Sequence, residues 1–176
     1  MNLLMANMQT VVSLYAGKKI LITGNGGFKG SWLALMLEHL KANILGYTLF
    51  PKTEFQHFDL CPGSYRTIEA DIRNYQKLYE TMAEFQPDFV FHLAAQPLVQ
   101  YSYTHPAETF SSNIEGTVNV LECVRLLQVP VCLIVTSDKV YDNKETLRGY
   151  LESDPLGGKD PYSASKAACE IVSHSY

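Results

Sequence analysis

The stretch "KKILITGNGGFKGSWLALMLEHL", from Lys18 to Leu40, decides how the rest of the chain is interpreted. A short apolar run stops at a glycine cluster, and a segment follows whose apolar residues fill most of a helix surface. This order predicts a strand over 18–23, a tight turn, and a helix packed on a sheet. In the turn, Gly24, Gly27 and Gly30 stand at GxxGxxG spacing. Glycine permits positive φ and lets backbone N–H groups approach a pyrophosphate, so the turn predicts a dinucleotide site, with a plain tight turn as the alternative.

Strand and helix keep alternating toward the C-terminus. Apolar runs predict strands at 43–49, in "RTIEAD", in "DFVFHLAA" and in "VPVCLIVTS". Helices are predicted in "NYQKLYETMAEF", within 107–127 and from "PYSASK" onward, with irregular segments at 51–64 and 142–160. This alternation predicts an α/β fold with a doubly wound, Rossmann-like parallel sheet, in which ligands bind beyond the carboxyl ends of the strands.

The bulk composition restricts the class of protein. The 176 residues carry a net charge of −4 without a basic block, which argues against a nucleic-acid or membrane-surface partner. We see no secretory signal and no apolar run long enough to cross a bilayer, so we expect a cytoplasmic protein. The cysteines (Cys61, Cys123, Cys132 and Cys169) form no CxxC pair and indicate reduced thiols, with Cys132 a core residue. No His/Cys cluster has ligand spacing, so we predict no metal.

The chain is predicted to consist of two segments. Residues 1–16 are expected to be an irregular leader, with later starts possible at Met5 or Met8, and residues 17–176 to form the dinucleotide-binding domain. Because Tyr176 falls inside an amphipathic helix without a cap or glycine stop, we expect that domain to be incomplete at its C-terminus. The fragment alone is therefore expected to be inactive and to expose apolar surface and an unpaired sheet edge.

The choice between NAD and NADP stays open at this stage. The residue that would bind the adenosine ribose should lie about 20 residues after the glycine turn. That region, "GYTLFPKTE", has no acid before Glu54 and no arginine, although Thr48 could bond the ribose and Lys52 could accept a phosphate. Asp71, at the end of the third strand, either bonds an adenine amino group or caps the following helix. Lys29 either meets phosphate or is simply solvated.

A second motif predicts proton-transfer chemistry. In "YSASK", Tyr162 and Lys166 lie four residues apart on one helix face. A neighbouring ammonium favours the phenolate, which can then remove a hydroxyl proton as hydride leaves the same carbon. "LIVTSDKVYDN" places Ser137 at the end of the fifth strand, followed directly by Asp138 and Lys139.

Together, TGxxGxxG, "HLAA" and YxxxK make the chain resemble the extended short-chain dehydrogenase/reductase family. Within it, the chain is similar to the nucleotide-sugar 4,6-dehydratases over "GFKGSWL", "HLAAQPLV", "TSDKVYDNKE" and "DPLGGKDPYSASK". The resemblance covers nearly the whole chain from Lys18 and implies about half of such a protein. It implies a lyase that uses NAD to convert CDP-glucose to CDP-4-keto-6-deoxyglucose, and a homodimer at full length.

The resemblance also implies roles for particular residues. Ser137 would bond the C4 oxygen, Tyr162 would remove its proton, and Lys166 would lower the pKa of Tyr162 and hold the nicotinamide ribose. Asp138 would be the acid for the C6 hydroxyl, and Lys139 would be the base for C5 only if its pKa were depressed, as burial beside other positive charge could do. The implied dinucleotide contacts are Gly24, Gly27, Phe28, Gly30, Asp71, Ile72, Ala94, Ala95, Gln96, Tyr162 and Lys166.

Four further residues are expected to lie near the cofactor or in the core beside it. Gln96 and Tyr101 are expected to border the nicotinamide or the sugar. Asn113 supports the cofactor side or is a buried, hydrogen-bonded Asn. His92 is expected to be a satisfied core histidine rather than a base.

Two alternatives to a dehydratase remain at this point. A nucleotide-sugar 4-epimerase or decarboxylase of the same family would need Ser137, Tyr162 and Lys166, and would leave Asp138 and Lys139 unexplained. A non-catalytic dinucleotide-binding or redox-sensing domain would bind the cofactor without turnover.

Overall fold

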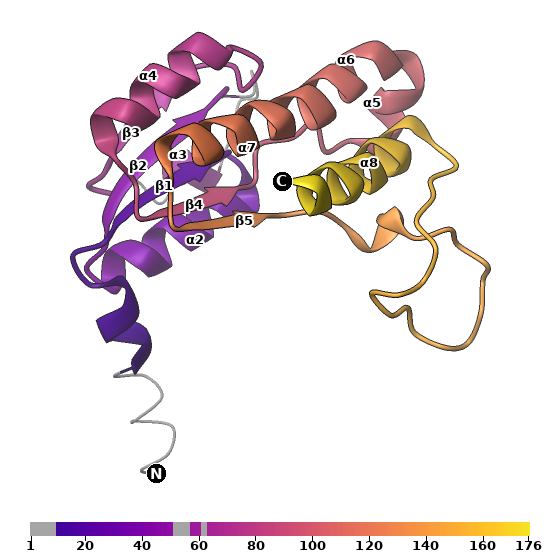
Figure 1. Ribbon diagram of the computed structural model, residues 1–176, viewed down its shortest axis with the longest axis horizontal. Helices are drawn as coiled ribbons and strands as arrows, with labels where there is room; N and C mark the ends of the chain where they lie inside the picture. The colour runs from indigo at the N-terminus through magenta and orange to yellow at the C-terminus, as the bar shows by residue number, and fades with distance from the viewer. Residues whose placement is uncertain (1–9, 51–56, 61–62) are drawn as a thin grey trace.

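The computed structural model describes residues 10–50, 57–60 and 63–176 (Figure 1). Its centre is a five-stranded sheet with the order β3-β2-β1-β4-β5, in which every neighbouring pair is parallel. The strands are β1 (Lys19–Thr23), β2 (Asn43–Thr48), β3 (Arg66–Glu69), β4 (Phe89–His92) and β5 (Val131–Ile134). The predicted doubly wound parallel sheet is confirmed. The strand order reverses between β1 and β4, so the ligand crevice of such a sheet lies at their carboxyl ends.

Helices cover the two faces of the sheet separately. Alternate residues of a strand point to opposite faces, so Ile20 and Ile22 pack under α2 (Phe28–His39), while Leu21 faces the other layer. That layer contains α4 (Tyr75–Phe85) and α7 (Gly116–Leu127), on the opposite side of the sheet from α2 in Figure 1. The central strands are buried on both faces, which explains their nearly continuous apolar sequence.

One long helical run, residues 106–127, lies between β4 and β5 in the chain. The predicted helix within 107–127 is present, but it consists of α6 (Pro106–Phe110), the π-helical turn η1 (Ser111–Glu115) and α7. A π-turn inserts one residue into the helix and often occurs at functional sites. Here it contains the buried Asn113.

The last helix, α8 (Pro161–Ser175), lies beside this run (Figure 1). Before it, α5 (Val99–Thr104) follows β4, and the short 3₁₀ turn η2 (Asp138–Val140) follows β5. The segment from 142 to 160 is irregular, as predicted, apart from a bridge between Tyr141 and Leu156 at its base.

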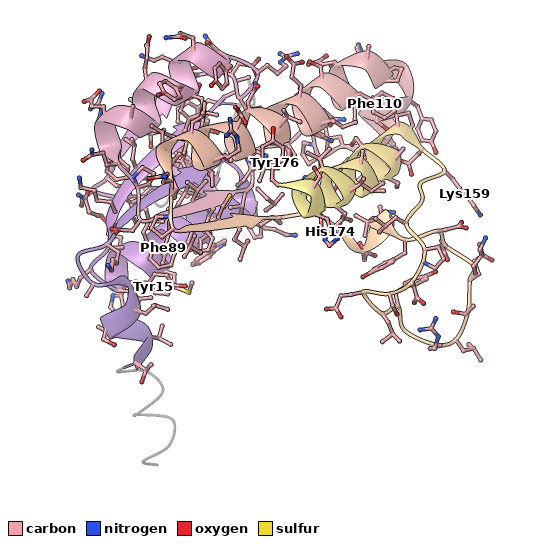
Figure 2. All side chains as sticks on the ribbon, viewed as in Figure 1. Tyr15, Phe89, Phe110, Lys159, His174 and Tyr176 are labelled. Carbon is pink, nitrogen blue, oxygen red and sulfur yellow. The ribbon has the colours of Figure 1, made fainter. Side chains whose placement is uncertain are left out.

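The structure corrects two predictions of irregular chain. Residues 10–15, inside the expected irregular leader, are helical, and the Tyr15 ring packs 5.5 Å from that of Phe89 on the underside of the sheet (Figure 2). Within the expected loop 51–64, α3 (His57–Leu60) is a short helix. Its His57 ring packs 4.6 Å from that of Trp32 on α2, which stabilises a turn too short to form alone. Met5, Met8, Lys52, Glu54 and Cys61 lie outside the described residues.

β5 is the outermost strand on its side of the sheet. Among the described residues it pairs with β4 alone, and Val131 and Leu133 on it are 43% and 47% exposed. An unpaired strand edge beside exposed apolar side chains is uncommon in a folded protein. This edge lies next to the end of β5, which leads into Ser137, Asp138 and Lys139.

Candidate active site

The glycine turn joins β1 to α2 and borders β4. Gly24 has φ +74°, and a Cβ there would lie 2.6 Å from the backbone nitrogen of Ala94. A Cβ on Gly30 would overlap the carbonyl oxygen of Gly24, so α2 can pack this closely on the turn only because the residue is glycine. Gly27 precedes α2 without a side-chain cap. The turn therefore presents backbone N–H groups at a helix N-terminus, the arrangement that binds phosphate.

A buried asparagine links this turn to the far strands. The Asn25 side chain is fully buried, and its Nδ2 donates to Thr67 Oγ1 on β3 at 2.9 Å. The Asn25 side chain also lies against Gly46 of β2, where any Cβ would overlap the Asn25 amide. Asn25 therefore fixes the height of the turn above β2 and β3. The glycine motif carries no signal for this role because the contacts are all tertiary.

The end of β3 carries a tightly paired carboxylate. Asp71 accepts the backbone N–H of Arg73 at 2.9 Å and the Arg73 guanidinium at 2.5 Å. Hydrogen bonding to Arg73 lowers the pKa of Asp71. The following helix is capped by Asn74, whose side chain accepts the N–H of Lys77. The interpretation of Asp71 as the helix cap is therefore wrong, while its bond to adenine stays a prediction.

The end of β2 offers little for a ribose. Thr48 is buried, and its hydroxyl donates to the carbonyl oxygen of Leu49 at 3.2 Å. Tyr47 donates to the backbone oxygen of Asp71 at 3.2 Å, and burial raises its pKa to about 12. Ile72, which follows Asp71 in the chain, is buried, and its carbonyl accepts a hydrogen bond from the Asn119 side chain. The Thr48 hydroxyl is thus already a donor to the backbone, although its oxygen can still accept.

The segment after β4 is held by Asn113. The Asn113 amide accepts the Gln96 N–H at 2.7 Å, donates to the Gln96 carbonyl at 3.2 Å, and donates to Ser165 Oγ at 2.8 Å. It therefore joins the β4–α5 connection, which includes Ala94 and Ala95, to α8. The side chain of Gln96 bonds to Thr109 and to the backbone of Leu98, so it stiffens its own loop. Asn113 is therefore a buried, hydrogen-bonded residue, as one interpretation predicted, and its bonds hold the segment after β4, as the other predicted.

His92, at the end of β4, is a satisfied core histidine, as predicted. It is 2% exposed, and its Nδ1 lies 2.7 Å from Thr23 Oγ1 and its Nε2 3.2 Å from Thr117 Oγ1. The Thr117 hydroxyl donates to the Asn113 carbonyl, so it accepts from Nε2–H, and Nδ1 accepts from Thr23. Burial, together with the charge of Lys166, lowers the pKa of His92 to about 3. The ring is neutral and unsuited to act as a base.

The triplet Ser137-Asp138-Lys139 turns out of the sheet at η2. Ser137 caps this turn: its Oγ accepts the Lys139 N–H at 3.2 Å and donates to Asp138 Oδ1 at 3.0 Å. Asp138 and Lys139 are both exposed. The burial that would make Lys139 a base is therefore not provided by the described residues, and its role stays a prediction.

Tyr162 and Lys166 lie on the first turns of α8, which begins at the cap Asp160 and at Pro161. Lys166 is 5% exposed, and its Nζ donates to the Val135 carbonyl at 3.1 Å, two residues before Ser137. Burial lowers the pKa of Lys166. The structure thus brings the YxxxK helix against the strand end that carries the triplet. The Tyr101 hydroxyl donates to Glu108 of α6 at 2.7 Å, and the place of Tyr101 beside the nicotinamide or the sugar stays a prediction.

Thr136 and Glu170 also lie where α8 packs against the end of β5, and neither was predicted from the sequence. The Thr136 hydroxyl donates to the Glu170 carboxylate in a short hydrogen bond. Glu170 lies four residues after Lys166, so the i, i+4 spacing that singled out Tyr162 and Lys166 could have extended to it.

The described residues also bear on the predictions about cysteines, metal ligands and membrane-spanning segments. Cys123, Cys132 and Cys169 are free thiols, and burial raises the pKa of the half-buried Cys132 to about 11. Within residues 10–50, 57–60 and 63–176, no three His, Cys, Asp or Glu side chains are grouped to hold a metal ion. No helix in that same part of the chain is long and apolar enough to cross a membrane.

The fold and the junction of triplet and YxxxK helix define the class: a Rossmann-like domain of the nucleotide-sugar epimerase and dehydratase type. The chain belongs to the GDP-mannose 4,6 dehydratase family, whose sequence profile matches residues 21–176. It is 43% identical to CDP-glucose 4,6-dehydratase of Salmonella typhimurium over 167 residues, which cover 93% of this chain and 46% of that protein.

Solved structures agree with this assignment. UDP-glucose 4-epimerase of Brucella ovis, in complex with NAD, superposes with a TM-score of 0.80 at 26% identity, over 91% of this chain and 48% of the epimerase. The UDP-glucose 4-epimerase of Thermus thermophilus, also a complex with NAD, gives 0.79 at 28% identity, over 90% and 50%. The chain spans about half the length of the relatives it matches.

Proposed function

We propose that the chain is the cofactor-binding half of an NAD-dependent nucleotide-sugar 4,6-dehydratase that converts CDP-glucose to CDP-4-keto-6-deoxyglucose and water. The observation that carries the proposal is the pair Asp138 and Lys139 directly after Ser137, in a chain 43% identical to a CDP-glucose 4,6-dehydratase. Hydride transfer alone requires no acid or amine at these positions. Elimination of water requires a group that protonates the departing hydroxyl.

The residues present fit a dinucleotide. Side chains at Gly24 and Gly30 would overlap the backbone, so the turn exposes N–H groups at the α2 N-terminus, among them that of Phe28. Asp71, held ionised by Arg73, would accept from the adenine amino group, and the Ile72 backbone would lie beside it. Ala94, Ala95 and Gln96 would border the ring across the crevice, and Lys166 would hold the nicotinamide ribose.

The chemistry divides among the residues of β5, η2 and α8. NAD, when bound, supplies the acceptor for the C4 hydride and later the donor that returns hydride to C6. Ser137 donates a hydrogen bond to the C4 oxygen while Tyr162, as phenolate, removes its proton, and the charge of Lys166 favours that phenolate. The resulting ketone makes the C5 proton acidic, so a base can remove it while Asp138 protonates the leaving C6 hydroxyl. The same base returns a proton to C5 when hydride adds to C6.

A mass spectrum of the product tests the proposal with the full-length protein, CDP-glucose and NAD. Loss of one water from the substrate is expected. An isobaric product would instead indicate a 4-epimerase, the alternative favoured by the likeness to the Brucella and Thermus enzymes. Binding of NAD without any product would indicate a non-catalytic domain.

A further inference from the structure

The end of β5 is joined to α8 at two consecutive residues. The Val135 carbonyl accepts from Lys166 Nζ at 3.1 Å, and the Thr136 hydroxyl donates to the carboxylate of Glu170. Lys166 and Glu170 are one helical turn apart, so both contacts come from the same face of α8. The next residue in the chain is Ser137, the first member of the predicted triplet.

The strand end needs these contacts because the sheet no longer holds it there. The last bond to β4 runs from the Val135 N–H to the His92 carbonyl at 3.0 Å, and β5 pairs on its other side with no strand among the described residues. Beyond Val135 the chain turns into η2, whose residues Asp138 and Lys139 are exposed. Thr136 is thus the last side chain that fixes the strand before the triplet begins.

We propose that Glu170 is a positioning residue that, through the Thr136 hydroxyl, holds Ser137 and Asp138 in place relative to Tyr162. The inference rests on the proposed function and deepens it. A carboxylate acceptor makes this bond stronger than one between neutral groups, and the helix that supplies it also carries Tyr162. Errors of about 1 Å in the placement of reacting groups cost on the order of a hundredfold in rate, so the loss of one such bond can be measured in kcat.

Glu170 also contributes charge near Lys166. The charged and titratable groups facing that ammonium are Glu170 and Cys169 on α8, His92 on β4 and Lys29 on α2. Glu170 raises the pKa of Lys166 and opposes the lowering caused by burial. A variant that loses the carboxylate should therefore deprotonate Lys166 at lower pH, while a variant that loses only the Thr136 hydroxyl should not.

The kinetic test uses Thr136→Val, Glu170→Ala, Glu170→Gln and the double variant Thr136→Val/Glu170→Ala in the full-length enzyme. We expect Thr136→Val and Glu170→Ala each to lower kcat about tenfold or more with KM changed less than about twofold, and the double variant to be no worse than the poorer single variant. Glu170→Gln, whose amide oxygen can still accept the bond, should restore most of kcat. Only the Glu170 variants should move the alkaline limb of the kcat profile to lower pH.

Thr81→Val is the matched control, because Thr81 is a buried threonine whose hydroxyl donates to the Lys77 carbonyl within its own helix, α4. It should leave kcat unchanged. Full kcat in Thr136→Val, or losses that multiply in the double variant, would overturn the inference. Thermal unfolding of each variant separates misfolding from misplacement, and Glu170→Gln retains the bond if Glu170→Ala unfolds.

A second readout needs no turnover. In the 176-residue chain, Thr136→Val and Glu170→Ala should speed hydrogen exchange by about tenfold at the Lys139 and Val140 amides, which donate to the side chain and the carbonyl of Ser137, and Glu170→Gln should not. Unchanged exchange in both would refute the positioning role. A wild-type enzyme that binds NAD but yields no dehydrated sugar would refute the proposed function instead, and the exchange result would still decide the role of Glu170.

Discussion

Replacement of Asn113 by alanine should destabilise the chain more than the loss of a typical buried side chain of its size. The Asn113 amide is 1% exposed and makes three hydrogen bonds, at 2.7 and 3.2 Å to the Gln96 backbone and at 2.8 Å to Ser165 Oγ. Each bond contributes about 0.5–1.5 kcal/mol net, and the Gln96 N–H and carbonyl would be left without this partner. We expect the free energy of unfolding to fall by about 3 kcal/mol.

Asn119→Ala is the matched control. Asn119 is a buried asparagine in the same helical run, and its side chain donates one hydrogen bond, from Nδ2 to the Ile72 carbonyl at 3.1 Å. Its replacement should cost about 1 kcal/mol. Urea unfolding of both variants, followed by far-UV circular dichroism at constant m-value, measures the difference. If Asn113→Ala costs no more than Asn119→Ala, Asn113 is not the link between the β4–α5 connection and α8.

The remaining predictions concern the turn, the buried histidine and the chemistry. The pKa of His92 is lowered from 6.5 to about 3, so between about pH 3 and 6.5 the unfolded chain binds one proton more than the folded chain. In that pH range the free energy of unfolding should rise with pH by up to about 1.4 kcal/mol per unit, and His92→Gln should flatten this slope in urea titrations. Gly24→Ala should abolish NAD binding in calorimetry and lower the melting temperature more than Gly17→Ala, because both glycines have positive φ but only Gly24 abuts backbone. Arg73→Gln should weaken NAD binding about tenfold while affecting the analogue with hypoxanthine in place of adenine less; equal losses would argue against adenine recognition by its carboxylate partner. Asp138→Asn in the full-length enzyme should slow loss of water more than cofactor reduction, as rapid-mixing absorbance would show, and equal slowing would make the residue structural.

The sheet could be predicted from the sequence because buried parallel strands leave a simple pattern. Runs such as 19–23 and 89–92 are apolar throughout, and the glycine turn between the first strand and helix identifies the carboxyl edge. The π-turn could not be predicted, since one inserted residue leaves apolar residues at three- and four-residue spacing. The helical residues 57–60 depend on stacking against α2, a contact that sequence periodicity does not encode.

The candidate site could be inferred from the sequence only as far as local motifs extend. The four-residue spacing singles out Tyr162 and Lys166, and the strand end singles out Ser137, while the roles of these residues stay predictions. Asp71 could not be assigned correctly between two roles, because the cap of α4 proved to be Asn74, three residues further on. Glu170 was missed because its partner, Thr136, is 34 positions away in the chain and meets it only once α8 has packed on β5.

The contact between Asn25 and Gly46 limits how this domain can vary in evolution. The side-chain amide of Asn25 lies so close to the Gly46 backbone that any β-carbon at position 46 would occupy the space of that amide. A change to alanine at 46 therefore becomes acceptable only after position 25 has become small, and the reverse order passes through a poorly folded intermediate. Positions 25 and 46 should thus change together in evolution. A glycine usually weakens a central strand, but here Gly46 makes the space that the Asn25 side chain occupies.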